Sequence, residues 1–107
     1  SLKQECDFMK ELRILMAGGL TQDKFEKKIK ELEEILKKEN ITPVITTVNT
    51  YEQKDLSSFE ADNDLVLAMG TLNIESELPV INGMGLMYGW MDRNKMIEEI
   101  VNIEIKN

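Results

Sequence analysis

The chain has 107 residues, of which 42% are hydrophobic and two are proline, so it is long enough for one compact core and too short for two. Its 20 acidic and 13 basic residues give a formal net charge of -7, which disfavours nucleic acid or anionic membrane as a partner because their phosphates would be repelled. The single cysteine, Cys6, excludes an internal disulfide, and no apolar run approaches the roughly 20 residues of a membrane span.

These features predict one soluble cytoplasmic domain that neither inserts into a membrane nor contacts nucleic acid. The chain opens Ser1-Leu2 without an initiator methionine or a signal-peptide pattern. Residues 1–8 are therefore interpreted as a leader, a linker or a cloning remnant, and residues 9–107 as the folded domain.

The first predicted element is a buried strand that ends at a pair of glycines, after which a helix begins. Leu12–Met16 is apolar apart from Arg13, which is typical of a central parallel strand buried on both faces. From Gln22 to about Glu39, apolar residues recur every three or four positions against a charged face, which predicts an amphipathic helix. Thr21 is placed to cap this helix, and Asn40 is placed to stop it.

Three further strands and two further helices are predicted in the rest of the chain. Val44–Val48 is β-branched throughout and indicates a second strand. A short helix over Tyr51–Leu56 is expected in an otherwise polar loop. Leu65–Met69 is a third buried strand, Pro79–Ile81 is a short fourth, and Asp92 to about Asn102 is a closing amphipathic helix.

The alternation of strands and helices predicts an α/β fold. We expect an open, doubly wound, four-stranded parallel sheet in the order 2-1-3-4, with helices on both faces. Ligands bind to such sheets beyond the carboxyl ends of the strands, where the winding reverses. The turn Ala17–Thr21 and the turn Gly83–Gly85 are expected to lie there as neighbours.

The turn after the first strand has the pattern of an anion-binding turn, because backbone N–H groups and a helix N-terminus point beyond the strand end. Phosphate is the usual guest of such turns. The residues that form it are Gly18, Gly19, Leu20, Thr21 and Gln22.

Two segments together carry a resemblance to a known family. The first is Ile14–Gly19 followed by a helix; the second is Glu77–Gly89, in which Pro and two aliphatic residues precede Gly-Met, apolar residues and a further Gly. This pattern resembles the galactitol-type enzyme IIB of the bacterial phosphoenolpyruvate-dependent sugar phosphotransferase system, with its lactose/cellobiose IIB-like fold, over most of residues 11–103. The resemblance implies a carrier whose cysteine takes phosphoryl from a phosphohistidine of the IIA protein and passes it to sugar bound by the membrane IIC protein.

The chain departs from that family at the residues that do chemistry. Ala17 occupies the phosphocysteine position, where it is expected to face the first-turn amides of the following helix, and a methyl group forms no thiolate or phosphoester. Asn82 stands where many relatives have histidine, Met91 stands where they tend to have glycine, and Asp23 adds negative charge near the turn. The chain has no histidine, which excludes phosphohistidine transfer, histidine-paired nucleophiles and histidine-ligated zinc. We expect no intact catalytic residue, no metal site and no cofactor.

A dense apolar patch follows the last strand, from Met84 to Met91. One interpretation is that it packs the closing helix onto the sheet, and the other is that it forms a docking surface. The residues expected to face a partner in the second case are Asn82, Gly83, Met84, Met87, Tyr88 and Trp90.

Two hypotheses for function follow. In the first, the domain lacks the nucleophile and serves as a regulatory or docking module, for example within a transcription regulator or antiterminator. Its partners are then the IIA and IIC proteins or adjacent regulatory domains. In the second, it is the IIB phosphoryl carrier of a galactitol-type sugar transporter, and Ala17 is an engineered or lineage-specific change.

Overall fold

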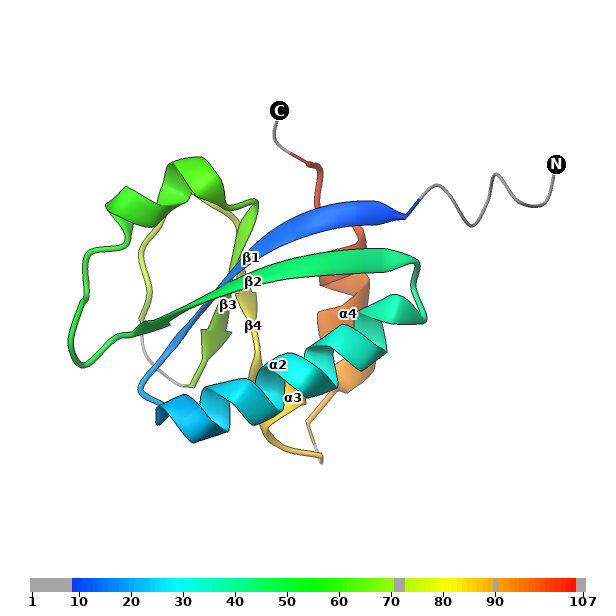
Figure 1. Cartoon of the computed structure of the whole chain (residues 1–107), viewed down its shortest axis with the longest axis horizontal. Coiled ribbons are helices and arrows are strands. Elements are labelled where there is room, and N and C mark those ends of the chain that lie inside the picture. Colours follow the sequence, from blue (N-terminus) through cyan, green and yellow to red (C-terminus); the bar gives the residue numbers. More distant parts are fainter. Residues whose placement is uncertain (1–8, 71–72, 90, 106–107) are drawn as a thin grey trace, which may run out of the picture.

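A computed structural model of the chain describes residues 9–70, 73–89 and 91–105 (Figure 1). The expected leader, which contains Cys6, and the expected partner-facing Trp90 lie outside the described residues. Among the described residues, no helix has the length and apolar character needed to cross a membrane.

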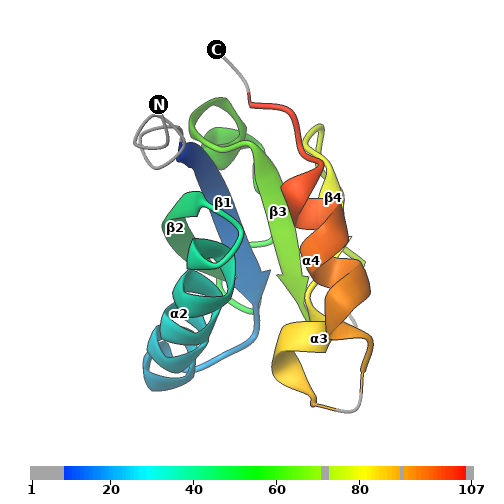
Figure 2. The same cartoon turned by 90° about the vertical axis from the view of Figure 1, so that its right-hand side faces the viewer.

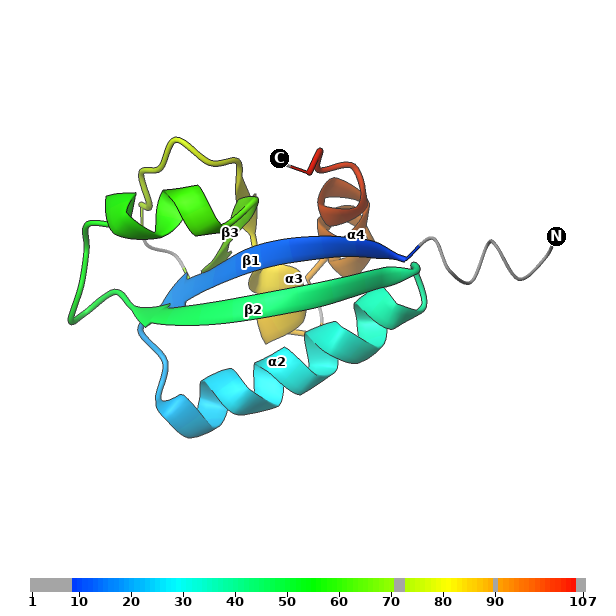
Figure 3. The same cartoon turned by 45° about the horizontal axis from the view of Figure 1, so that its top comes forward.

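The sheet is built around strand β1 (Lys10–Gly18). Strand β2 (Ile41–Asn49) pairs with one side of β1, while β3 (Leu65–Met69) pairs with its other side and is followed by β4 (Val80–Asn82). All pairings are parallel and the order is β2-β1-β3-β4, which confirms the predicted α/β sheet. Figure 3 shows β1 and β2 running side by side along their whole length.

Helices cover both faces of this sheet. Helix α2 (Gln22–Lys37), the short α3 (Met84–Met87) and α4 (Arg93–Val101) pack on one face, where α3 contacts both longer helices (Figure 2). The 3-10 helix η1 (Ser57–Asp62) packs on the opposite face.

Side chains of β1 alternate between two apolar clusters, one on each face, as the two-residue period of a strand requires. The cluster beneath α2 and α4 is the larger, and the cluster beneath η1 is smaller. The buried members of the larger cluster are Leu12, Ile14, Met16, Leu20, Phe25, Leu32, Leu36, Ile41, Leu65, Leu67, Met69, Ile81, Leu86, Met96 and Ile100. The buried members of the smaller cluster are Leu15, Ala17, Val48, Leu56, Val66 and Leu78.

Helix α2 begins where the sequence predicts and ends two residues earlier, at Lys37. The Thr21 hydroxyl accepts a hydrogen bond from the backbone N–H of Lys24 at 3.3 Å, which caps the helix as expected. Asn40 has a φ of 60°, in the left-handed region that asparagine tolerates, and this conformation ends the helical path.

The predicted helix over Tyr51–Leu56 is wrong, because helix η1 begins only at Ser57. Asn49 starts a turn instead, and its carbonyl oxygen accepts hydrogen bonds from the backbone N–H groups of Glu52 at 3.0 Å and Gln53 at 2.9 Å. The Asp55 side-chain oxygen accepts the backbone N–H of Ser57 at 3.0 Å, which turns the chain just before η1.

Candidate functional site

The structure brings the two predicted turns to the same edge of the sheet, at the carboxyl ends of the strands. They line one hollow of about 230 Å³. Its lining residues are Gly19, Leu20, Tyr51, Met69, Gly70, Met84, Met87 and Tyr88, none of which carries a charge at neutral pH. We name this hollow the turn hollow.

The glycine pair is explained by close neighbours rather than by backbone conformation. A Cβ atom at Gly18 would lie 2.4 Å from the backbone oxygen of Met69. A Cβ atom at Gly19 would lie 2.2 Å from the ring of Tyr51. Among the described glycines only Gly70 has a positive φ. Gly18 and Gly19 are therefore required by close packing at the strand end and not by their backbone conformation.

Ala17 does not face the first turn of α2, and this expectation is corrected by the structure. Its side chain is fully buried in the cluster beneath η1, together with Leu15 and Val66, on the face of the sheet opposite α2. The reason is the strand period, because β1 remains regular up to Gly18 and therefore turns residue 17 to the same side as residue 15.

The turn itself is held by Asn49, which is not among the residues expected at the site. The Asn49 side-chain amide donates to the carbonyl of Leu20 at 3.3 Å, and its side-chain oxygen accepts from the backbone N–H of Tyr51 at 2.9 Å. The signal in the sequence is an asparagine directly after a β-branched run, which is typical of a side chain that bonds its local backbone.

The electrostatics of the turn do not favour an anion. Beyond the turn hollow, a second hollow of about 510 Å³ adjoins the start of α2 and includes Thr21 and Gln22. Among the described residues that line either hollow, there is no lysine or arginine, and Glu52 lines the second. Backbone donors at a helix start without a cation give weak anion binding at most.

The segment from Asn82 to Tyr88 contains helix α3, which the sequence does not predict. The Asn82 side-chain oxygen accepts a hydrogen bond from the backbone N–H of Met84 at 2.8 Å, which turns the chain just before this helix. Leu86 is fully buried in the core, whereas Tyr88 is 42% exposed. Part of the apolar patch therefore packs the core, as the first interpretation expects, and part of it faces solvent.

Two basic side chains fix α3 from the neighbouring helices. Lys28 of α2 donates to the carbonyl of Leu86 at 3.2 Å, and Arg93 of α4 donates to the carbonyl of Gly85 at 2.9 Å. Glu31 of α2 lies 2.9 Å from the Lys28 ammonium and 4.0 Å from the Arg93 guanidinium. Cations at the carboxyl end of a helix are stabilising, so α2 and α4 together position this segment.

Of the predicted partner-facing residues, Asn82 and Tyr88 are exposed, Met84 and Met87 are half-buried, and Gly83 is buried. Tyr51 is 76% exposed, and its ring lies over Gly19. No local pattern in the sequence marks Tyr51 as a site residue, because the loop after β2 returns to the Gly19 turn only in the folded chain.

The described residues contain no group of three His, Cys, Asp or Glu side chains that could hold a metal ion. No protein-family model, no curated protein and no solved structure matches the chain.

Proposed function

We propose that this chain is a cytoplasmic docking or regulatory module of the enzyme IIB type, in the bacterial sugar phosphotransferase system, without phosphoryl-transfer chemistry of its own. One observation carries the proposal. The uncharged turn hollow is lined by two exposed tyrosines, Tyr51 and Tyr88, at the sheet edge where α/β proteins bind ligands.

The composition of this surface suits protein docking better than catalysis. Tyrosine and methionine are enriched in protein interfaces, where charged residues are depleted from the centre. At the strand end, the position that corresponds to the family's nucleophile is Ala17, a buried methyl group. The carrier alternative requires a thiol at this position that is open to a phosphorylated donor, so we favour the docking role.

The partners that suit this role are the IIA and IIC proteins of a galactitol-type system, or regulatory domains adjacent in a transcription regulator or antiterminator. Helix α3 is held by side chains from α2 and α4, so its surface is presented without a large ordering cost on binding. The two tyrosines are expected to contribute most of the binding free energy, as buried aromatic anchors do.

The test is an NMR titration of the isotope-labelled domain with a purified galactitol-type IIA protein. Binding should shift the amide signals of Gly19, Tyr51 and Tyr88, and Tyr51→Ala or Tyr88→Ala should weaken it by about tenfold or more. The matched control is Lys38→Ala, an exposed residue at the other end of α2, which should leave the affinity unchanged. Binding that leaves these signals in place, or no binding at all, would contradict the proposal.

A further inference from the structure

The outer edge of β4 is the open end of the sheet, since β3 is its only described strand neighbour. The backbone N–H of Gly83, just after β4, donates to the carbonyl of Ala68 in β3 at 2.8 Å. Backbone groups of successive strand residues point in alternate directions, so those of Val80 and Asn82 point away from β3. This edge therefore presents two donors and two acceptors outward.

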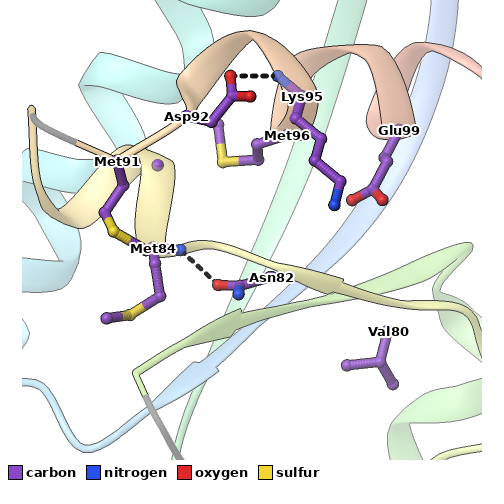
Figure 4. A pocket seen from close by; sticks show the side chains of 9 residues that line it. Val80, Asn82, Met84, Met91, Asp92, Lys95, Met96 and Glu99 are labelled. Carbon is purple, nitrogen blue, oxygen red and sulfur yellow. Dashed lines mark hydrogen bonds between the residues drawn. The ribbon is translucent and has the colours of Figure 1, made fainter.

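A groove of about 350 Å³ lies directly beside this edge, between β4 and α4 (Figure 4). Val80 and Asn82 line it from the strand side, and Val80 is 41% exposed. Three methionines line its apolar part, namely Met84, Met91 and Met96. Methionine side chains adapt their shape to different apolar groups, so the groove suits an inserted aliphatic side chain.

The charged residues that line the groove come from α4 and its N-cap. Asp92 and Glu99 are acidic and Lys95 is basic, so the lining carries a net charge of -1 within a chain of net charge -7. The Asp92 side-chain oxygen accepts the backbone N–H of Lys95 at 3.0 Å, and this fixes one carboxylate at the groove (Figure 4). A partner with basic residues would be attracted, and an acidic one would be repelled.

We propose that the β4 edge accepts an extended, basic segment of a partner protein as a fifth strand, with one apolar side chain of that segment in the methionine-lined groove. Strand addition of this kind combines main-chain hydrogen bonds along an open edge with a pocket for alternate side chains. The inference rests on the proposed docking function and deepens it, because Met84 lines both this groove and the turn hollow.

A bare strand suits the groove better than a second copy of this chain. Helix α4 packs against β4, as Figure 2 shows. A second copy carries the same net charge of -7, so it would be repelled from this acidic groove, whereas a basic segment would be attracted.

The experiment selects binding segments from a phage-displayed library of random linear peptides. Enriched peptides should combine lysine or arginine with alternating apolar residues. They should bind Val80→Pro about tenfold more weakly than the wild type, because proline removes the outward N–H, whereas Val80→Thr, which keeps this N–H, should weaken binding less. The Val80 N–H is not needed by the β3 ladder, so Val80→Pro should remain folded. In the wild type, bound peptide should also slow hydrogen exchange at the Val80 and Asn82 amides.

The two proposals can fail separately in this experiment. Peptides that lose affinity with Tyr88→Ala, bind Val80→Pro normally and leave the Val80 amide unprotected would support the docking surface and overturn strand addition. Peptides insensitive to both substitutions would overturn both proposals. Enrichment of acidic peptides, or of none, would overturn strand addition at this edge.

Discussion

Removal of the Asp64 carboxylate should destabilise the domain more than any other single charge change on the sheet. The Asp64 side chain is fully buried where β3 begins, and one oxygen accepts the backbone N–H of Arg13 at 2.8 Å. The Arg13 guanidinium donates to the same carboxylate at 3.3 and 3.4 Å. The backbone N–H of Asp64 donates in turn to the carbonyl of Arg13 at 2.8 Å, so the two residues join the start of β3 to β1.

The magnitude follows from what Asp64→Ala leaves without a partner. A hydrogen bond to a charged group contributes about 1.5–3 kcal/mol, and a buried N–H left unpaired costs about 1–3 kcal/mol. The Arg13 side chain is 34% exposed and can be hydrated again, so its loss adds little. We expect Asp64→Ala to lower the free energy of unfolding by about 2–3 kcal/mol, and Asp64→Asn by less, because the amide oxygen still accepts the N–H.

The measurement is urea unfolding followed by circular dichroism, with Asp62→Asn as the matched control. Asp62 is an exposed acid two residues away, so its neutralisation should change the free energy of unfolding by less than about 0.5 kcal/mol. The Asp64 hydrogen bond raises the pKa of Arg13, whose ordinary value is already above the pH range of folding experiments. A raised pKa gives stability that is lost only as pH rises through it, so titration of Arg13 adds no pH dependence near neutrality. Equal effects of Asp64→Ala and Asp62→Asn would refute the reasoning.

Three further substitutions test single contacts. Thr50→Val should stabilise the domain by about 1 kcal/mol in urea unfolding, because the Thr50 hydroxyl is buried without a hydrogen-bond partner among the described residues. A loss of stability would mean that the hydroxyl has a hydrogen-bond partner. Ile81→Pro should destabilise the domain by at least about 1 kcal/mol more than Val80→Pro, since of these two residues only Ile81 directs its N–H towards β3. Equal losses of stability would contradict the assignment of the Val80 N–H to the outer edge of β4. Lys10→Met should lower the free energy of unfolding by about 1 kcal/mol and speed hydrogen exchange at the end of α4, because the Lys10 ammonium donates to the carbonyls of Val101, the last residue of α4, and of Ile103 beyond it; unchanged exchange would show that these bonds do not hold the helix end.

The sequence predicts the framework well because its strands and long helices carry strong periodic signals. The apolar run Leu12–Met16 marks the centre of β1, but the strand extends to Lys10 and Gly18 because it pairs with β2 along its whole length. Polar residues at strand ends carry no apolar signal, so the predicted β1 and β2 are too short, whereas β3 has the predicted bounds. Arg13 interrupts the apolar run of β1. Its partner Asp64 lies 51 positions further along the chain, so no local sequence pattern predicts this contact.

The site is less predictable because it depends on loops that return to the sheet edge. The sequence pairs the Gly18 turn with the Gly83 turn from the winding rule alone, and the turn hollow includes residues from both segments. Tyr51 joins them only because Asn49 turns the chain after β2, and that contact depends on tertiary structure. The side chain of Ala17 is buried under η1 because β1 continues regularly for two residues beyond its apolar run, to Gly18. A shift of one residue in the strand would turn this side chain to the other face.

This reversal changes what a thiol at position 17 should do. In a Cys6→Ser background, Ala17→Cys would place sulfur among Leu15, Val48 and Val66, where burial in apolar surroundings raises the pKa of a thiol. Alkylation by iodoacetamide should then be at least about tenfold slower in the native protein than in urea, with no phosphoryl adduct after incubation with a phosphorylated IIA protein.

The matched control for this test is Gln22→Cys, at an exposed position where α2 begins. The positive end of the helix lowers the pKa of a thiol placed there, so it should alkylate readily in the native state. If Ala17→Cys instead reacted as fast as this control, or carried phosphoryl by mass spectrometry, residue 17 would face the turn after all. The carrier hypothesis would then replace the docking hypothesis, because the only part missing from a phosphoryl-transfer site would be its sulfur atom.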